Sequence, residues 1–352
     1  MHKSYSNAQK DSRSLAFKKI RSSAPFSKKK TAVDSMVCSL AEKQFFKLVL
    51  GGSFTDTNRI AHLVTAYAKA GIDCIDMAAD VAVIDVVSET LTQNKQNTRS
   101  LLKKARPVLM ISLPLDPDPH FRKITLNRDN CIDCGICIPE CPSGAMAIPK
   151  TTLEISQSLC FGCSRCVPAC PVDALKVLPF RVEKTMHAAL SHGSVGAVEI
   201  HSHYCDAAML SEFLEKYSDS LKKRLLSLCF RPKALTAKQI TDFFQVAQNF
   251  SPHPVVIQAD GDSMSGQLGE DKSIPALNAA DTIKKAFLQL NLPVPYITIS
   301  GGISEKTALH LQNDRHQYIA GVAVGTVARQ WVYASDSLKA YQQAKTLVNH
   351  FH

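Results

Sequence analysis

Eight cysteines in the middle of this chain fall into two copies of one spacing, and they restrict its fold and chemistry more strongly than any other feature. Each copy reads C-x2-C-x2-C-x3-C and is followed by proline, and the second copy starts 29 residues after the first. Bacterial proteins ligate [4Fe–4S] clusters with this run, and the fourth cysteine of each run binds the cluster of the other run. The spacing therefore predicts two [4Fe–4S] clusters, one held by Cys131, Cys134, Cys137 and Cys170, the other by Cys160, Cys163, Cys166 and Cys141.

The two runs are also alike outside the cysteines, which indicates an internal duplication. Residues 126–148 resemble residues 155–177, an arrangement similar to that of bacterial two-cluster ferredoxins. Disulfides are a poorer interpretation, because they need an oxidising compartment and the chain has no recognisable secretory signal peptide. Zinc is also poorer, because its sites usually place a longer gap between two Cys-x2-Cys pairs. We therefore expect a cytoplasmic protein, and we interpret the other four cysteines as buried structural thiols: Cys38, Cys74, Cys205 and Cys229.

The net charge of +10 is concentrated at the N-terminus. Residues 1–30 carry nine Lys and Arg and a single acid, Asp11, so the rest of the chain is close to neutral. Such a segment is typical of a disordered, solvated tail, and we assign residues 1–44 to it. An electrostatic arm for an acidic partner and an organellar transit peptide are the alternatives. Since the folded part has little net charge, nucleic acid is not an expected partner, and no apolar run is long enough to span a membrane.

Short apolar segments alternate with helical patterns along the rest of the chain. An example of the helical patterns is residues 236–249, where Thr236 and Gln239 fit a capping box. Eight strands alternating with helices is the count of a (β/α)8 barrel, and this is the fold we predict for the α/β part. An open doubly wound α/β sheet is the alternative. The predicted strands are Lys47–Phe54, Cys74–Ala78, Pro107–Leu113, Ala197–His203, Leu225–Phe230, Val255–Asp260, Tyr296–Ser300 and Ile319–Gly325.

Both cysteine runs lie in a segment that interrupts this alternation after the third strand. We assign residues 119–181 to a ferredoxin-like insertion, between a first part of the barrel at residues 45–118 and a second part at residues 182–352. A module inserted in a βα loop lies on the C-terminal face of a barrel, where barrel enzymes keep their active sites. The clusters are therefore expected beside the barrel mouth.

Glycines follow the seventh and eighth predicted strands, where barrels often bind phosphate. Gly301 and Gly302 precede a helix that we expect to begin at Ser304, and Gly325 and Thr326 follow the last strand. Backbone amides at such glycines, close to a helix N-terminus, are suited to a phosphate group, and the arrangement is similar to the phosphate site of flavin mononucleotide (FMN) barrels. Ordinary turn chemistry explains the same glycines without a ligand.

Polar residues close several of the predicted strands and could converge at the barrel mouth as binding or acid–base groups. Alternatively they cap buried strands and pair with one another. These residues are Glu199, His201, His203, Arg231, Lys233, Gln258 and Asp260.

With the two cysteine runs inside an α/β chain of this length, the sequence resembles the light-dependent period family, iron–sulfur proteins of the cyanobacterial circadian input pathway. The resemblance implies a regulator that senses cellular redox state through its clusters and adjusts the clock. It also implies partners among the input kinases and oscillator proteins of the clock. Only the eight cysteines are carried over from the family.

Three functions remain open from the sequence. We expect an iron–sulfur redox-sensing regulator, because no clear catalytic constellation accompanies the clusters. The alternative is an enzyme, an FMN- and iron–sulfur-dependent oxidoreductase with its active site at the barrel mouth. A plain electron carrier is the poorest interpretation, because a carrier needs only the inserted segment and the remaining chain would have no role.

Overall fold

Eight parallel strands close into a barrel in the computed structural model, which describes residues 31–97, 106–262, 269–333 and 336–352. The strand order around the barrel is β1-β12-β11-β10-β9-β8-β3-β2, so the predicted (β/α)8 barrel is confirmed and the open sheet is wrong. The barrel strands are β1 (Phe45–Gly51), β2 (Cys74–Ala78), β3 (Val108–Pro114), β8 (Val195–His201), β9 (Leu225–Phe230), β10 (Val256–Asp260), β11 (Tyr296–Ser300) and β12 (Ile319–Val324).

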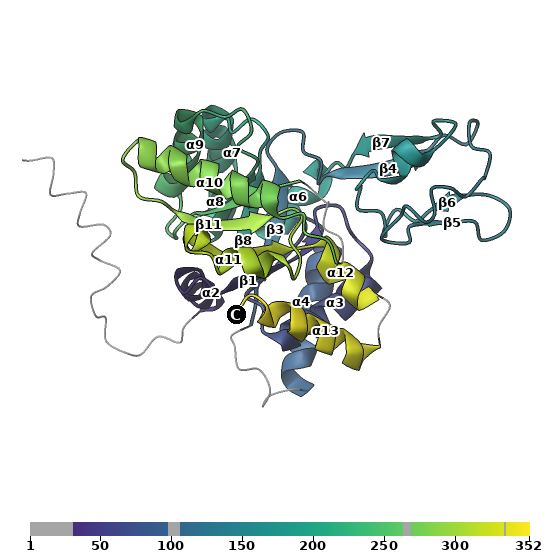
Figure 1. The fold of residues 1–352 in the computed structure, drawn as a ribbon, viewed down its shortest axis with the longest axis horizontal. Coiled ribbons are helices and arrows are strands. Elements are labelled where there is room, and N and C mark those ends of the chain that lie inside the picture. Colours follow the sequence, from purple (N-terminus) through teal and green to yellow (C-terminus); the bar gives the residue numbers. More distant parts are fainter. Residues whose placement is uncertain (1–30, 98–105, 263–268, 334–335) are drawn as a thin grey trace, which may run out of the picture. The chain divides into compact units, whose positions relative to one another are not determined.

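Helices follow the strands and surround the barrel. Figure 1 shows α3, α4, α12 and α13 gathered on one side of the strands, and α7, α9 and α10 on the other. No helix in the described ranges is long and apolar enough to cross a membrane. The helices are α2 (Ala32–Ala41), α3 (Thr57–Ala70), α4 (Val81–Asn97), α6 (Glu183–Ser191), α7 (Ala207–Lys216), α8 (Ser218–Leu221), α9 (Ala237–Phe250), α10 (Ile274–Gln289), α11 (Thr307–Leu311), the 3-10 turn η1 (Asp314–His316), α12 (Thr326–Tyr333) and α13 (Ser337–Asn349).

The sequence determines several helix starts locally. The predicted capping box at α9 is present, with Thr236 accepting from the Gln239 amide and Gln239 reaching back to the Thr236 amide. Asp206 accepts from two amides in the first turn of α7, which satisfies donors that a helix start otherwise leaves without a partner.

The barrel interior has an apolar floor at its N-terminal end. Phe45, Cys74, Met110, Ala197, Leu225 and Val256 contribute to this layer, and Met36 and Leu40 of α2 pack against it from below. Because side chains alternate along a strand, the residue two positions further along faces the interior one layer higher.

Helix α2 contradicts part of the prediction that residues 1–44 form a disordered tail. Residues 32–41 were assigned with the basic segment to the disordered range 1–44, but they form a helix whose Met36 and Leu40 are 1% exposed. The physical reason is that a barrel leaves an apolar interior open at its N-terminal end, and an amphipathic helix covers it. The basic residues 1–30 lie outside the described part of the chain.

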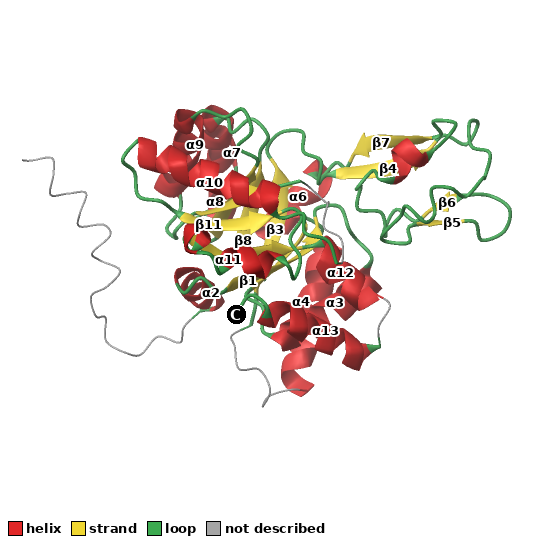
Figure 2. Cartoon of the chain, in the orientation of Figure 1, coloured by secondary structure: helices red, strands yellow, loops and turns green. Residues whose placement is uncertain are grey.

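The inserted module, residues 122–179, leaves and rejoins the barrel through one antiparallel pair of strands. β4 (Arg122–Leu126) pairs with β7 (Leu175–Pro179) so that Arg122 lies opposite Pro179. A second pair, β5 (Met146–Ala147) with β6 (Glu154–Ile155), and the short α5 (Cys166–Ala169) complete it. Figure 2 shows that the rest of the module is mainly loop.

Candidate functional site: two groups of four cysteines beside the barrel mouth

The structure brings the eight cysteines together in two groups of four, and each group takes its fourth member from the other run. Cys131, Cys134, Cys137 and Cys170 line one small cavity. In the second group, Cys163, Cys141 and Cys160 are the neighbouring thiols whose charges act on Cys166. The spacing predicts this crossed grouping for two clusters, and the assignment of the ligands stays a prediction.

The duplication is visible in the backbone as well as in the sequence. Left-handed residues recur at equivalent positions 29 apart: Asp133 and Gly162, Gly135 and Ser164, Gly144 and Asp173. The amide that follows each proline turn donates to the fourth cysteine of its run, from Ala145 to Cys141 Sγ at 3.2 Å and from Ala174 to Cys170 Sγ at 3.3 Å. Amides that point at sulfur in this way also tune the potential of an iron–sulfur cluster.

The donor set fits iron–sulfur clusters. Burial raises the pKa of Cys137, and the nearby Cys134, Cys170 and Cys131 raise it further. Burial and the neighbouring thiols likewise raise the pKa of Cys166 to about 12. Four thiolates at such spacing repel one another unless a bound cation compensates their charge, and a coordinated metal deprotonates a thiol outright.

Three contacts join the second cysteine group to the barrel. Arg59 of α3 donates to the carbonyl of Ser143, two residues after Cys141, at 2.6 Å. Lys123 Nζ donates to the carbonyl of Ser53 after β1, and at 2.6 Å to the carbonyl of Cys160. The amide of Thr55 donates to Ser158 at 3.1 Å. We call the Cys141, Cys160, Cys163 and Cys166 group the proximal group and the other the distal group, whose Cys134 is exposed.

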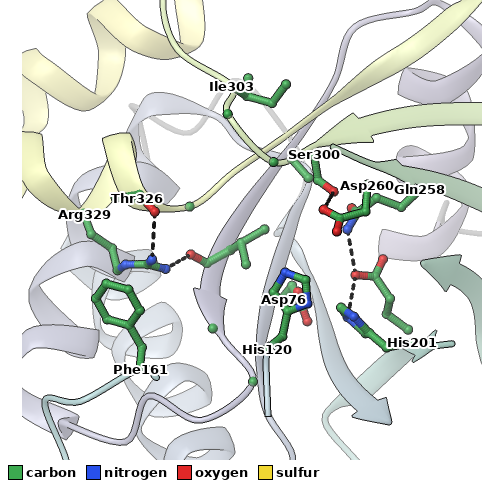
Figure 3. Close-up of a pocket in the computed structure, with 18 residues that line it drawn as sticks. Asp76, His120, Phe161, His201, Gln258, Asp260, Ser300, Ile303, Thr326 and Arg329 are labelled. Carbon is green, nitrogen blue, oxygen red and sulfur yellow. Dashed lines mark hydrogen bonds and ion pairs between the residues drawn. The ribbon is translucent and has the colours of Figure 1, made fainter. Parts of the chain in front are cut away.

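Phe161, between two proximal cysteines, enters the barrel mouth. Its ring lies 4.4 Å below the guanidinium of Arg329, and it is 5% exposed. The equivalent residue of the first run, Ile132, is 63% exposed. The two runs therefore differ at this position: Phe161 packs beside Arg329 in the barrel mouth (Figure 3), whereas Ile132 is exposed.

Arg329 connects this ring to the barrel strands. Its Nη1 donates to the carbonyls of Val49 and Leu50 in β1, both at 2.9 Å, and its Nη2 to Thr326 Oγ1 at 3.4 Å. Planar guanidinium groups stack well on aromatic faces while their edges donate. Arg329 therefore links the Phe161 ring to β1 and to the start of α12.

A charged layer lies directly above the apolar floor of the barrel. Lys47 of β1 and Glu199 of β8 form an ion pair that is fully enclosed. Glu199 also accepts from Ser227 at 2.8 Å and Gln258 at 3.0 Å, and Asp76 of β2 accepts from Ser112 at 2.6 Å. Barrel interiors are normally filled by branched apolar side chains, so a layer of this kind indicates a site.

Burial and neighbouring charges shift the pKa values in this layer. Burial alone would lower the pKa of Lys47, but Glu199 and Asp76 raise it above its ordinary value. Burial would raise the pKa of Glu199, but Lys47 and His201 hold it below its usual range. Burial raises the pKa of Asp76 to about 6 against the opposing effect of Lys47. Shifted values of this kind are typical of functional sites.

Two histidines and an aspartate meet at the rim of the same cavity. His120 Nδ1 lies 2.7 Å from Asp118 Oδ1, and His201 Nδ1 lies 3.8 Å from Asp118 Oδ2. Burial opposes the ionisation of Asp118, but the two histidines hold its pKa below its usual range. Asp118 and His120 belong to the segment that leads into the module, while His201 ends β8.

Some of the polar residues predicted at strand ends line the mouth cavity, and others lie outside it. Glu199, His201, Gln258 and Asp260 line the mouth cavity together. Arg231 lies 3.7 Å from Asp260 and, with Lys233, lines a neighbouring hollow. His203 is exposed and packs against Tyr204, away from the cavity.

The four residues predicted for phosphate also line the mouth cavity: Gly301, Gly302, Gly325 and Thr326. The predicted helix start at Ser304 is wrong, because α11 begins at Thr307 and Ser304 Oγ donates to the Glu270 carbonyl instead. Since α11 has only five residues, the loop after β11 offers no long helix N-terminus to an anion.

The backbone conformation and close packing at position 302 are sufficient to explain why this residue is glycine, without a bound phosphate. Its φ is +81°, and a Cβ there would lie 2.0 Å from the carbonyl oxygen of Lys272. We expect Gly302→Ala to lower the free energy of unfolding by at least about 1–3 kcal/mol, the cost of a strained backbone alone. Urea unfolding under anaerobic conditions measures this change in the free energy of unfolding. Gly193→Ala is the matched control, because a Cβ there meets nothing within 4 Å; equal effects of the two substitutions would contradict the packing explanation.

Sequence reasoning missed Lys47, Asp76, Asp118, His120 and Arg329. A lysine or aspartate inside an apolar strand, as in FFKLVLG and CIDMA, is the signal that could have found the first two. The other three lie in loops or helices and meet the site only through the folded barrel.

Comparison with solved structures gives distant similarity. The chain is 11% identical to a tryptophan synthase from M. tuberculosis, with a TM-score of 0.44 over 91% of this chain and 99% of that one. It is 13% identical to (S)-3-O-geranylgeranylglyceryl phosphate synthase from Thermoplasma acidophilum, with a TM-score of 0.43 over 91% and 98%.

Comparison with sequence families gives a closer relation. A 4Fe-4S dicluster domain matches residues 124–177, which include both cysteine runs, and the Light dependent period A C-terminal domain matches residues 189–351. Light dependent period A of Synechococcus elongatus is 29% identical over 324 residues, 83% of this chain and 82% of that protein. Residues 189–351 therefore belong to the Light dependent period A C-terminal domain family, residues 124–177 match a 4Fe-4S dicluster domain, and the chain as a whole is similar to Light dependent period A.

Proposed function

We propose that this chain is an iron–sulfur redox-sensing regulator that binds two [4Fe–4S] clusters and passes their state to the barrel. The distal cluster is held by Cys131, Cys134, Cys137 and Cys170, and the proximal cluster by Cys141, Cys160, Cys163 and Cys166. By its relationship to the light-dependent period family, the chain adjusts the circadian period to light or cellular redox state. Its partners are input and oscillator proteins of the clock.

The observation that carries the proposal is the position of Phe161. It directly follows one proximal cysteine and packs beneath Arg329 in the barrel mouth. Oxidation, reduction or loss of the proximal cluster changes the charge and shape of the loop that bears Phe161. Since Arg329 holds the carbonyls of Val49 and Leu50, the change reaches β1 of the barrel.

Hydrogen–deuterium exchange on the intact protein, oxidised and dithionite-reduced under anaerobic conditions, tests this coupling. We expect exchange in residues 49–54 and 325–329 to differ between the two states. Phe161→Ala is expected to remove the difference while leaving the iron content unchanged. Ile132→Ala, at the equivalent and exposed position of the first run, is the matched control and is expected to preserve it. Identical exchange of the oxidised and reduced wild type would overturn the proposal.

Partner binding provides the second test. Cluster-ligand substitutions are expected to change binding to the clock partners and the period of the rhythm. If both stay as in the wild type, the clusters are not the sensor.

The second candidate is an oxidoreductase that uses FMN at the barrel mouth. The supporting observation is that Gly301, Gly302, Gly325 and Thr326 share one cavity with Phe161, next to the proximal cysteines. The residues that line it also include Asp76, Glu199 and Asp260, which do not favour an anionic phosphate nearby. Anaerobic purification followed by iron, sulfide and flavin analysis separates the candidates, because stoichiometric flavin supports the enzyme and its absence from both preparation and titration excludes it.

A further inference from the structure

We propose that Asp118, His120 and His201 form a binding site for one divalent transition-metal ion at the barrel mouth, separate from the cysteine groups. One ligand atom from each of the three residues lies within 4.8 Å of the other two. Two imidazoles and one carboxylate are a donor set that suits Zn²⁺ or Fe²⁺.

The distances between the donors match those around such an ion. Two ligands at the usual 2.0–2.1 Å from zinc, arranged tetrahedrally, lie roughly 3.3 Å apart. The observed separations, 2.7 Å for His120 Nδ1 to Asp118 Oδ1 and 3.8 Å for His201 Nδ1 to Asp118 Oδ2, fall on either side of this value. Movements of the donor atoms by about half an ångström, through side-chain rotation, are enough to reach it.

His201 is the strongest sign of a missing partner. The residue is 4% exposed, its Nδ1 makes no hydrogen bond within the described part of the chain and lies 3.8 Å from Asp118, and its Nε2 has the ion-pair contact to Glu199. A buried polar group without a partner costs free energy. Phe121 holds the imidazole ring edge-on, with the ring centroids 5.3 Å apart, so Nδ1 faces Asp118 in a fixed orientation.

The second nitrogen of His201 has the neighbour that a metal ligand requires. Nε2 lies 3.3 Å from Glu199 Oε1, and Glu199 is itself held by Lys47. Metal-binding histidines almost always present their other nitrogen to a carboxylate or carbonyl, which fixes the ring and increases its basicity. Figure 3 shows this contact between His201 and the carboxylate of β8.

The charge of the mouth also favours a cation. Three carboxylates, Asp76, Glu199 and Asp260, line the cavity that His120 and His201 share, against the guanidinium of Arg329. Lys47 compensates Glu199, and Arg231 lies 3.7 Å from Asp260. A divalent ion between the histidines and Asp118 would compensate the carboxylates that remain.

A second group, Glu199, His201 and Cys229, also brings one donor atom from each residue within 4.8 Å of the other two, but it is the poorer candidate. Its Glu199 already accepts from Lys47, Ser227 and Gln258, and all three members are buried. In the first group, His120 and His201 line the mouth cavity, so an ion there keeps a position for water or an exchangeable ligand.

Binding would join two parts of the chain that are distant in sequence. Asp118 and His120 belong to the segment between β3 and the module, and His201 ends β8. An ion held by both would fasten the entry of the module to the barrel rim.

Anaerobic equilibrium dialysis of the cluster-loaded protein against Zn²⁺, followed by elemental analysis and X-ray absorption at the zinc edge, tests the proposal. We expect about one zinc per chain with unchanged iron, and first-shell distances of about 2.0–2.1 Å from nitrogen and oxygen only. Zinc–sulfur distances of about 2.3 Å would place the ion in a cysteine group and overturn the proposal, as would the absence of bound zinc.

Variants locate the ion. Asp118→Asn, His120→Gln and His201→Gln are each expected to weaken zinc binding at least about tenfold. His120 and Asp118 are partly exposed, so their variants remain informative if the buried His201→Gln fails to fold. His310→Gln removes another His–Asp contact, 2.6 Å to Asp271, and is the control expected to bind zinc as the wild type does. Unchanged affinity in the Asp118 and His120 variants would overturn the proposal.

Discussion

Cys170→Ser is expected to remove the same cluster as Cys134→Ser, although Cys170 belongs to the other cysteine run. Cys170 lines the cavity of Cys131, Cys134 and Cys137, so both substitutions take a ligand from the distal cluster. We expect iron to fall from about eight to about four or fewer per chain, because the interleaved runs also destabilise the surviving cluster. Both variants are expected to give the same electron paramagnetic resonance spectrum, that of the remaining proximal cluster.

Two substitutions in the proximal group provide the complementary test of the crossed arrangement. Cys141→Ser and Cys163→Ser each remove a ligand of the proximal cluster. Both are expected to give the electron paramagnetic resonance spectrum of the remaining distal cluster. If Cys170→Ser instead matches Cys163→Ser, each run binds its own cluster and the crossed assignment is wrong. Cys38→Ser is the control, because this cysteine belongs to helix α2 and not to either run, and its iron content is expected to equal that of the wild type.

Lys47→Met is expected to lower the free energy of unfolding by about 3–5 kcal/mol at neutral pH, because it leaves the Glu199 carboxylate buried without its cation. In the wild type, the ion pair holds the pKa of the Glu199 carboxyl below its usual range. The stability that the pair contributes is therefore fully present above the unfolded-state pKa of Glu199, and it is lost as the pH falls through the lower folded-state pKa. In the variant, burial raises the pKa of Glu199, and protonation relieves the cost. The destabilisation is therefore expected to be smaller at about pH 6 than at about pH 8.

Urea unfolding followed by circular dichroism under anaerobic conditions measures this effect. Lys238→Met removes an exposed pair with Asp242 on α9 and is the matched control, with an expected change within about 0.5 kcal/mol. Adding Glu199→Gln to Lys47→Met is expected to recover part of the loss, because no unpaired charge remains. A Lys47→Met variant as stable as Lys238→Met would show that the buried charged layer does not hold the barrel together.

Much of the fold was predictable because its signals are local. The alternation of short apolar strands with amphipathic helices indicated the barrel, and Thr236 with Gln239 marked the start of α9. Helix α2 was missed because its short pattern follows a basic segment and its burial depends on a barrel floor built from residues as distant as Ala320. Ser304 was misassigned because a serine after two glycines looks like a cap, while its hydroxyl bonds to Glu270, which is 34 residues away.

The barrel mouth was only partly predictable. Glu199, His201, Gln258 and Asp260 could be named as strand-end polar residues, but nothing in the sequence joined them to Lys47 or Asp76. Which side of a strand faces the interior is decided when the sheet closes. Asp118 and His120 meet His201 only because the segment after β3 folds back over the end of β8.

The sequence by itself determined the cysteine chemistry, since ligands spaced two and three residues apart are brought together by the local backbone. It also determined the order of strands and helices, because side-chain periodicity is a property of short segments. Only the tertiary structure decided that Phe161 reaches Arg329 while the equivalent Ile132 stays in solvent. It alone decided that a charged layer lies inside the barrel, because the Lys47–Glu199 contact joins residues 152 positions apart, whose meeting depends on the closure of the whole barrel.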